Sequence, residues 1–166
     1  GRLGGRGRAS EVAALADHGG CAGAVVDCDP AYVSEARFPT AKRIVVEGGN
    51  FDALEQLDAA PEDYVCVLTR GHMFDPEGCV WATRHHVHYV GMMGGAGKND
   101  RVRELVLASG ATEEDWERVK RPIGLKFGAK TPPGLATAIV AELVDGRYRQ
   151  RYSAEARERH EKSLGR

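Results

Sequence analysis

Short apolar runs alternate with segments of helix length along this chain of 166 residues. The most regular part covers residues 64–97, where two apolar runs, 64–68 and 88–93, flank a segment of helix length at 76–86. Each run ends in polar or glycine residues. The order strand, loop, helix, strand and glycine loop indicates a parallel α/β sheet. Because such sheets bind ligands beyond the carboxyl ends of their strands, function is expected first in the residues that follow these two runs.

The flanking segments predict more elements of the same kind. Apolar spacing predicts helices over residues 10–17, 51–57, 99–109 and 131–144, a short helix from Thr112, and strands over 23–27 and 43–47. The expected N-caps are Asn50, Asn99 or Asp100, Thr112 and Thr131, since such side chains accept hydrogen bonds from the first N–H groups of a helix. Residues 121–127 are expected to form a turn and a short extended run. We therefore expect one α/β domain over residues 1–146 with a mostly parallel sheet.

Composition narrows the function classes. The formal net charge of −1 argues against a general nucleic-acid binder, and no apolar run approaches the roughly 20 residues of a membrane span. The four cysteines show no C-x-x-C spacing, so we expect no zinc site, and thiols without a disulfide framework suit the cytoplasm. Cys66 lies inside an apolar run and is expected to be a small buried hydrophobe. Residues 147–166 are basic and are expected to form a charged tail.

A glycine-rich turn opens the chain. Gly5 and Gly7 precede the first predicted helix, and the strand after that helix ends in Asp27. This order is typical of a dinucleotide-binding unit, in which glycines admit a pyrophosphate to the helix N-terminus and the acid binds ribose hydroxyls. Only Arg2 and Leu3 remain of the strand that should come first, so a flexible terminus is an open alternative. The weak first strand also favours a homodimer in which a second copy covers the exposed edge.

The loop after the run at 64–68 carries four candidate ligand-binding residues, Thr69, Arg70, Gly71 and His72. Arginine can pair with phosphate, glycine permits close backbone approach, and imidazole can bond to a ligand or act as a base. A surface charge and a purely structural loop are the alternatives for Arg70 and His72. Asp75 could orient His72, but we expect it to cap the following helix.

The loop at 94–98 leads from the second run into a predicted helix. Its glycines, with Gly94 first, would bring main-chain N–H groups to an anion at the helix N-terminus, and Lys98 would add positive charge. A mobile hairpin without a ligand is the alternative. Three histidines between residues 85 and 88 straddle a helix end and a strand start, so we expect no metal site there.

In order along the chain, these motifs resemble a known family. They are V-V-D-x-x-P at 25–30, R-F-P-x-A at 37–41, V-L-T-R-G-H-x-x-D at 67–75, Y-V-G-M-M-G…K at 89–98, and P-I-G-L…G-A-x-T-P at 122–132. The set is similar to the C-terminal domain of the XdhC/CoxI family, and the resemblance covers roughly residues 3–142. It implies a Rossmann-like three-layer fold. It also implies an accessory role in the maturation of molybdenum hydroxylases such as xanthine dehydrogenase.

The resemblance further implies a ligand and a partner. The ligand would be a molybdenum-pterin cofactor or a nucleotide such as NAD(P), and the partner a molybdenum hydroxylase apoenzyme. Family members usually carry histidine at the position of Arg8. The expected cofactor-binding residues are Gly5, Gly7, Arg8, Asp27, Thr69, Arg70, Gly71, His72, Gly94 and Lys98.

Two other functions stay open. An NAD(P)-dependent oxidoreductase would need a catalytic donor, and the chain offers no convincing catalytic pair beyond His72 itself. A non-catalytic assembly module would use the sheet as a support and the basic residues 147–166 as the contact with a partner protein.

Overall fold

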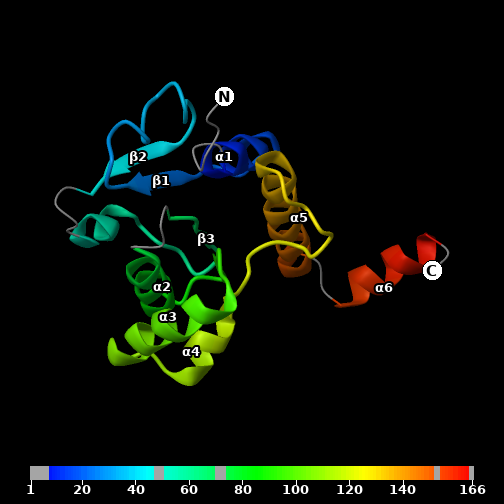
Figure 1. Cartoon of the computed structure of the whole chain (residues 1–166). Coiled ribbons are helices and arrows are strands. Elements are labelled where there is room, and N and C mark those ends of the chain that lie inside the picture. Colours follow the sequence, from blue (N-terminus) through cyan, green and yellow to red (C-terminus); the bar gives the residue numbers. More distant parts are fainter. Residues whose placement is uncertain (1–7, 47–50, 70–73, 152–153, 165–166) are drawn as a thin grey trace.

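The computed structural model describes residues 8–46, 51–69, 74–151 and 154–164 (Figure 1). Gly5, Gly7, the expected remnant of a first strand and residues 70–72 therefore lie outside the described residues. Within them, strands and helices follow one another along the chain, and a loop joins the first two strands, at 24–27 and 42–45.

All ladders in the described part of the chain are parallel. β1 (Ala24–Asp27) pairs with β2 (Lys42–Val45), and β3 (Tyr64–Val67) pairs with β4 (Tyr89–Met92), which in turn pairs with β5 (Val119–Lys120). These ladders form one two-stranded and one three-stranded sheet. Because neighbouring strands run the same way, the loops that follow them gather at one edge of each sheet.

Helices cover both faces of the three-stranded sheet. On one face lie α2 (Asp75–Arg84) and α3 (Ala96–Ala108), and on the other α1 (Arg8–His18) packs beside α5 (Pro132–Arg151) (Figure 1). A 3₁₀ helix, η2 (Phe51–Gln56), follows β2, and α4 (Glu113–Arg118) leads into β5. The last described helix is α6 (Ala154–Ser163).

Two clusters of buried side chains reflect these three layers. Val67, Val90 and Val119, one from each strand, point to the same face and pack in the larger cluster with residues of α2 and α3. On the opposite face, Ile139 of α5 meets Val12 of α1 in a smaller cluster. Successive side chains of a strand point to opposite faces, so each strand contributes to both layers. The arrangement is that of a Rossmann-like three-layer α/β fold.

Two of the sequence predictions for the α3 and β5 region were wrong. α3 begins at Ala96 with Gly95 at the N-cap, so neither Asn99 nor Asp100 caps it. The helix starts almost as soon as β4 ends, and the two candidate caps fall inside its first turns. The extended segment near residue 121 lies earlier than expected, as β5 at Val119–Lys120.

The last long helix extends past its predicted end at residue 144 to Arg151. No proline interrupts this stretch, and Arg149 pairs with Asp145 one turn earlier, at 2.7 Å between Nε and Oδ2. Such a pair four residues apart favours continued helix. The division of the chain into residues 1–146 and a tail at 147–166 stays a prediction.

Two predicted helix caps are confirmed. The hydroxyl of Thr112 accepts a hydrogen bond from the Asp115 N–H at 3.1 Å, and the Asp115 carboxylate accepts one from the Thr112 N–H at 2.9 Å. These bonds to Thr112 lower the pKa of the Asp115 carboxyl. At the start of α5, the hydroxyl of Thr131 accepts from the Gly134 N–H at 3.3 Å.

A half-buried carboxylate joins α5 to the sheet. Glu142 accepts hydrogen bonds from the Tyr89 hydroxyl of β4 at 2.8 Å and from the Gly124 N–H at 2.5 Å, and its other oxygen lies 3.3 Å from the ammonium of Lys120. Burial and the bond to Glu142 raise the pKa of the Tyr89 phenol. The Tyr89 hydroxyl reaches along β4 to Gly91, where an added Cβ atom would lie 2.5 Å from it, so this network lies beside the middle of the strand.

Candidate functional site

The carboxyl ends of β3 and β4 lie next to each other. Val67 and Met92, the last residues of these strands, are paired in register, and the N–H of Met93 donates to the Val67 carbonyl at 3.2 Å. Thr69 and Gly94 each follow two residues later. The structure therefore brings these two predicted site residues to the same edge, which we call the rim.

Two helices begin at the rim without a side-chain cap. The N-cap residue of α2 is Phe74 and that of α3 is Gly95, and neither accepts a hydrogen bond from the helix with its side chain. α4 and α5 are both capped by a threonine. The first N–H groups of a helix carry partial positive charge and need acceptors. The rim is thus a place where an anionic group would be stabilised.

Asp75 does not cap α2, so that prediction was wrong. It is the first residue inside the helix, its side chain is fully buried, and its carboxylate accepts the hydrogen bond that the Thr69 hydroxyl donates. The sequence D-P favours a cap, but the burial of this carboxylate depends on the packing of α2 against β3. This hydrogen bond links the residue just after β3 to the first residue of α2.

Gly94 lies where the chain passes close to the first turn of α3. A Cβ atom at Gly94 would lie 2.6 Å from Oδ1 of Asn99, closer than such atoms approach in proteins, so the absence of a side chain matters here. Oδ1 of Asn99 is itself buried without a hydrogen-bond partner. Lys98 belongs to the same first turn of α3.

Asp27 and Arg8 belong to other elements. Asp27 is the last residue of β1, and its Oδ1 accepts a hydrogen bond from the Asp29 N–H at 2.9 Å, which closes a local turn. Arg8 is the first residue of α1. The predicted residues Gly5, Gly7, Arg70, Gly71 and His72 lie outside the described residues. Cofactor binding by the whole predicted set stays a prediction.

His85 contacts the end of α2 and the neighbouring η2. Nδ1 of His85 lies 2.9 Å from the Trp81 carbonyl, its Nε2 lies 3.4 Å from a carboxylate oxygen of Glu55, and its ring packs on that of Trp81 at 4.5 Å between centroids. In the described residues, no group of three or more His, Cys, Asp or Glu side chains is arranged to hold a metal ion.

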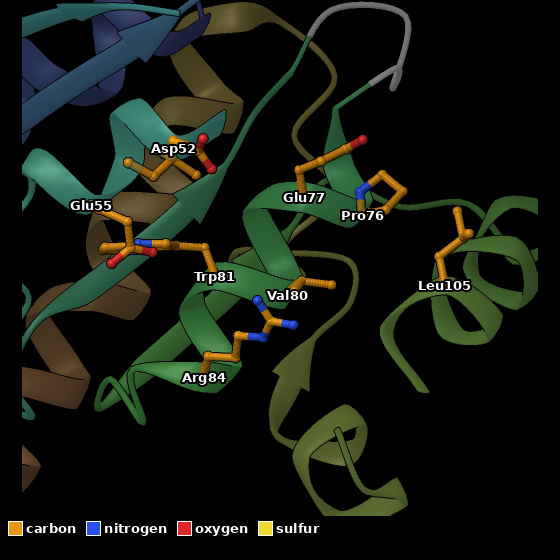
Figure 2. A pocket seen from close by; sticks show the side chains of 9 residues that line it. Asp52, Glu55, Pro76, Glu77, Val80, Trp81, Arg84 and Leu105 are labelled. Atoms are coloured by element: carbon orange, nitrogen blue, oxygen red, sulfur yellow. The ribbon is translucent and has the colours of Figure 1, made fainter. Parts of the chain in front are cut away.

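Sequence reasoning missed a hollow of about 310 Å³ on the outer side of α2 (Figure 2). It lies between η2, α2 and α3, and Figure 2 shows Trp81 pointing from α2 toward Glu55. Nε1 of Trp81 and Oε2 of Glu77 are buried without hydrogen-bond partners. Glu77, Trp81 and His85 are four residues apart, a spacing that puts them on one helix face. The third wall comes from η2, which the sequence could not place.

Comparison with known proteins decides the family. A model of the XdhC Rossmann domain matches residues 3–143. The chain belongs to the XdhC Rossmann-domain family. This agrees with the resemblance of the ordered motifs and with the three-layer fold.

Similar proteins share this domain within longer chains. The chain is 29% identical over 138 residues to a probable xanthine dehydrogenase subunit of Bacillus subtilis, covering 83% of this chain and 39% of that protein. It is 24% identical over 121 residues to an uncharacterized protein of Escherichia coli, YqeB, covering 73% of this chain and 22% of that protein. The XdhC domain described here therefore spans less than half the length of these relatives.

A solved structure has the same fold. The crystal structure of a xanthine dehydrogenase from Bacillus halodurans superimposes with a TM-score of 0.70 at 24% identity, over 91% of this chain and 42% of that one. The XdhC domain thus shares its architecture with part of that protein.

Among the described residues, none of the helices combines the length and the apolar character that a membrane span requires.

Proposed function

We propose that this XdhC domain serves in an accessory protein for the maturation of a molybdenum hydroxylase of the xanthine dehydrogenase type. In this role it binds a molybdenum-pterin cofactor, or a nucleotide such as NAD(P), at the rim. The family membership and the relative named as a xanthine dehydrogenase subunit support the accessory role. The partner that follows from it is the apoenzyme of the hydroxylase, in the cytoplasm.

One observation carries the proposal for ligand binding. The two helices that start at adjacent strand ends, α2 and α3, have no side-chain cap, whereas α4 and α5 are capped. Phosphate groups, which both candidate ligands contain, are well matched to uncapped helix N-termini. Gly94 keeps the approach to α3 free of a side chain.

Titration of the purified domain with molybdenum cofactor, NADH and NADPH tests this binding. We expect saturable binding of at least one of them, which Gly94→Ala weakens because the added methyl group must displace the Asn99 side chain at the rim. Gly23→Ala is the matched control, since a Cβ atom there meets nothing within 4 Å. If none of the three ligands binds at high micromolar protein concentration, the rim is not a cofactor site.

The oxidoreductase and the assembly module stay alternatives. If Asp27 holds an adenosine ribose, Asp27→Ala weakens NADH binding by roughly 1–3 kcal/mol, the effect of losing a charge-assisted hydrogen bond. Turnover of NADH with a bound substrate would favour the oxidoreductase. Partner binding that is lost with residues 152–166 and is independent of any cofactor would favour the assembly module.

Binding to the apoenzyme is tested separately. We expect a complex of the domain, or of the longer protein that carries it, with a cofactor-free xanthine dehydrogenase in size-exclusion chromatography. Light scattering of the domain alone tests the expected homodimer. A monomer that makes no complex with the apoenzyme in either the presence or absence of cofactor would contradict the proposed partner.

A further inference from the structure

The hydrogen bond between Thr69 and Asp75 has a fixed direction. Asp75 is fully buried at the start of α2, and a buried carboxylate is costly unless donors surround it. In this pair the Thr69 hydroxyl is the donor and Oδ1 of Asp75 is the acceptor. Asp75 therefore holds the single proton that the Thr69 side chain can donate.

The oxygen of Thr69 consequently has only lone pairs left to offer. A hydroxyl group has one donor and two acceptor positions, and the donor is used. Thr69 is half-buried, and within the described residues Asp75 is the hydrogen-bond partner of its hydroxyl. An ionised phosphate oxygen is also an acceptor, so it gains nothing from Thr69. A ligand hydroxyl, amine or amide N–H group, in contrast, can donate a hydrogen bond to the Thr69 oxygen.

We propose that Thr69 determines specificity at the rim by accepting a hydrogen bond from an N–H or O–H group of the ligand, and that Asp75 is the positioning residue that fixes this polarity. The inference rests on the proposed cofactor binding and deepens it. It separates the rim into two parts: Thr69 meets a donor-bearing ring or sugar, and the phosphate lies away from it.

The register of the strands fits this division. β3 and β4 are hydrogen-bonded neighbours, so their ends lie about 4.8 Å apart. The uncapped start of α3 follows β4, next to the position of Thr69 after β3. A phosphate ester whose adjoining sugar or ring carries a donor can thus meet the α3 amides and Thr69 together. A ligand that carries only acceptors forms no hydrogen bond with Thr69.

The test compares Thr69→Val, which keeps the shape but removes the oxygen, with Thr69→Ser, which keeps both oxygen and proton. NADH and purified molybdenum cofactor are the donor-bearing probes. Sulfate, a dianion without a proton to donate, is the acceptor-only probe, and its contact with the rim is read from the amide signals of Gly94 and Gly95 in ¹H–¹⁵N spectra.

We expect Thr69→Val to weaken binding of the donor-bearing probe about tenfold, the effect of one lost hydrogen bond, while Thr69→Ser stays within twofold of wild type. The shifts that sulfate induces in the wild type should have the same size in Thr69→Val and in Thr69→Ser. General damage to the rim would instead weaken both classes of probe. If Thr69→Val does not fold because Asp75 loses its donor, Thr69→Cys is tested in its place, since a thiol is a weak donor and a weaker acceptor. Thr69→Cys should then bind the donor-bearing probe less tightly than Thr69→Ser does.

Two failures can be told apart. If wild type binds neither NADH nor molybdenum cofactor, the proposed function fails, and this inference with it. If wild type binds one of them but Thr69→Val binds it within twofold or more tightly, or loses sulfate shifts in proportion, only the role of Thr69 is overturned.

Discussion

Replacing Glu142 by alanine should destabilise the domain more than an ordinary substitution on a partly exposed helix such as α5 does. Its carboxylate, with a side chain only 12% exposed, accepts from the Tyr89 hydroxyl and the Gly124 N–H. The alanine variant leaves both donors without their acceptor, at about 1–3 kcal/mol each, whereas the half-exposed ion pair with Lys120 adds well under 1 kcal/mol. We therefore expect a loss of about 3 kcal/mol in the free energy of unfolding.

A double-mutant cycle separates this mechanism from a loss of helix packing. Tyr89→Phe alone should cost about 1 kcal/mol, and Glu142→Gln, which keeps one acceptor oxygen, should cost less than Glu142→Ala. Because the two side chains share one hydrogen bond, the double variant Tyr89→Phe/Glu142→Ala should lose about 1 kcal/mol less than the sum of its parts. Urea unfolding measures all four values. Strict additivity, or a loss below about 0.5 kcal/mol for Glu142→Ala, would refute the reasoning.

Three further predictions concern stability. Gly91→Ala should cost about 1–3 kcal/mol in urea unfolding, because its Cβ would lie 2.5–2.7 Å from tyrosine and isoleucine side-chain atoms, whereas Gly23→Ala should change little; equal effects would contradict this. Burial raises the pKa of the Cys66 thiol to about 12. The neutral thiol therefore contributes fully to the free energy of unfolding below the usual thiol pKa near 9, and this contribution is lost as the pH rises toward 12. Cys66 should accordingly resist a thiol reagent at pH 8 that modifies the exposed Cys28, and rapid labelling of both would count against it. Thr112→Ala should cost about 1 kcal/mol at pH 7 and less at acid pH, because the capping bonds depress the pKa of the partner carboxyl and their contribution fades as pH falls through that pKa.

Local signals in the sequence were sufficient for most elements. The capping box at Thr112 and the threonine before Pro132 depend on contacts within four residues, and both are present in the structure. The strands at 64–67 and 89–92 follow from apolar runs that are bounded by polar or glycine residues. Such features need no knowledge of the rest of the fold.

Features that depend on distant contacts were missed or misread. Asp75 has the sequence context of a helix cap, yet tertiary packing buries it, and the Thr69 hydroxyl becomes its donor. β5 has only two residues, and its pairing with β4 defines it rather than its own composition. The hollow beside α2 needs a wall from η2, whose placement no local pattern reports.

The candidate site was predictable only in part for the same reason. The resemblance of the ordered motifs pointed to the family, and the parallel pattern placed Thr69 and Gly94 after neighbouring strands. The polarity of Thr69 could not be predicted, because it depends on which carboxylate the fold brings to its hydroxyl. Which predicted residues contact a ligand stays a prediction.

The most direct test of ligand binding at the rim is a titration of the ¹⁵N-labelled domain with molybdenum cofactor and with NADH, followed by amide signals. We expect saturable shifts at Thr69, Gly94 and Gly95, where β3 and β4 end, and none at Tyr64 or Tyr89, the first residues of these two strands. Shifts confined to the amino ends, or the absence of saturable shifts with both ligands, would contradict the account.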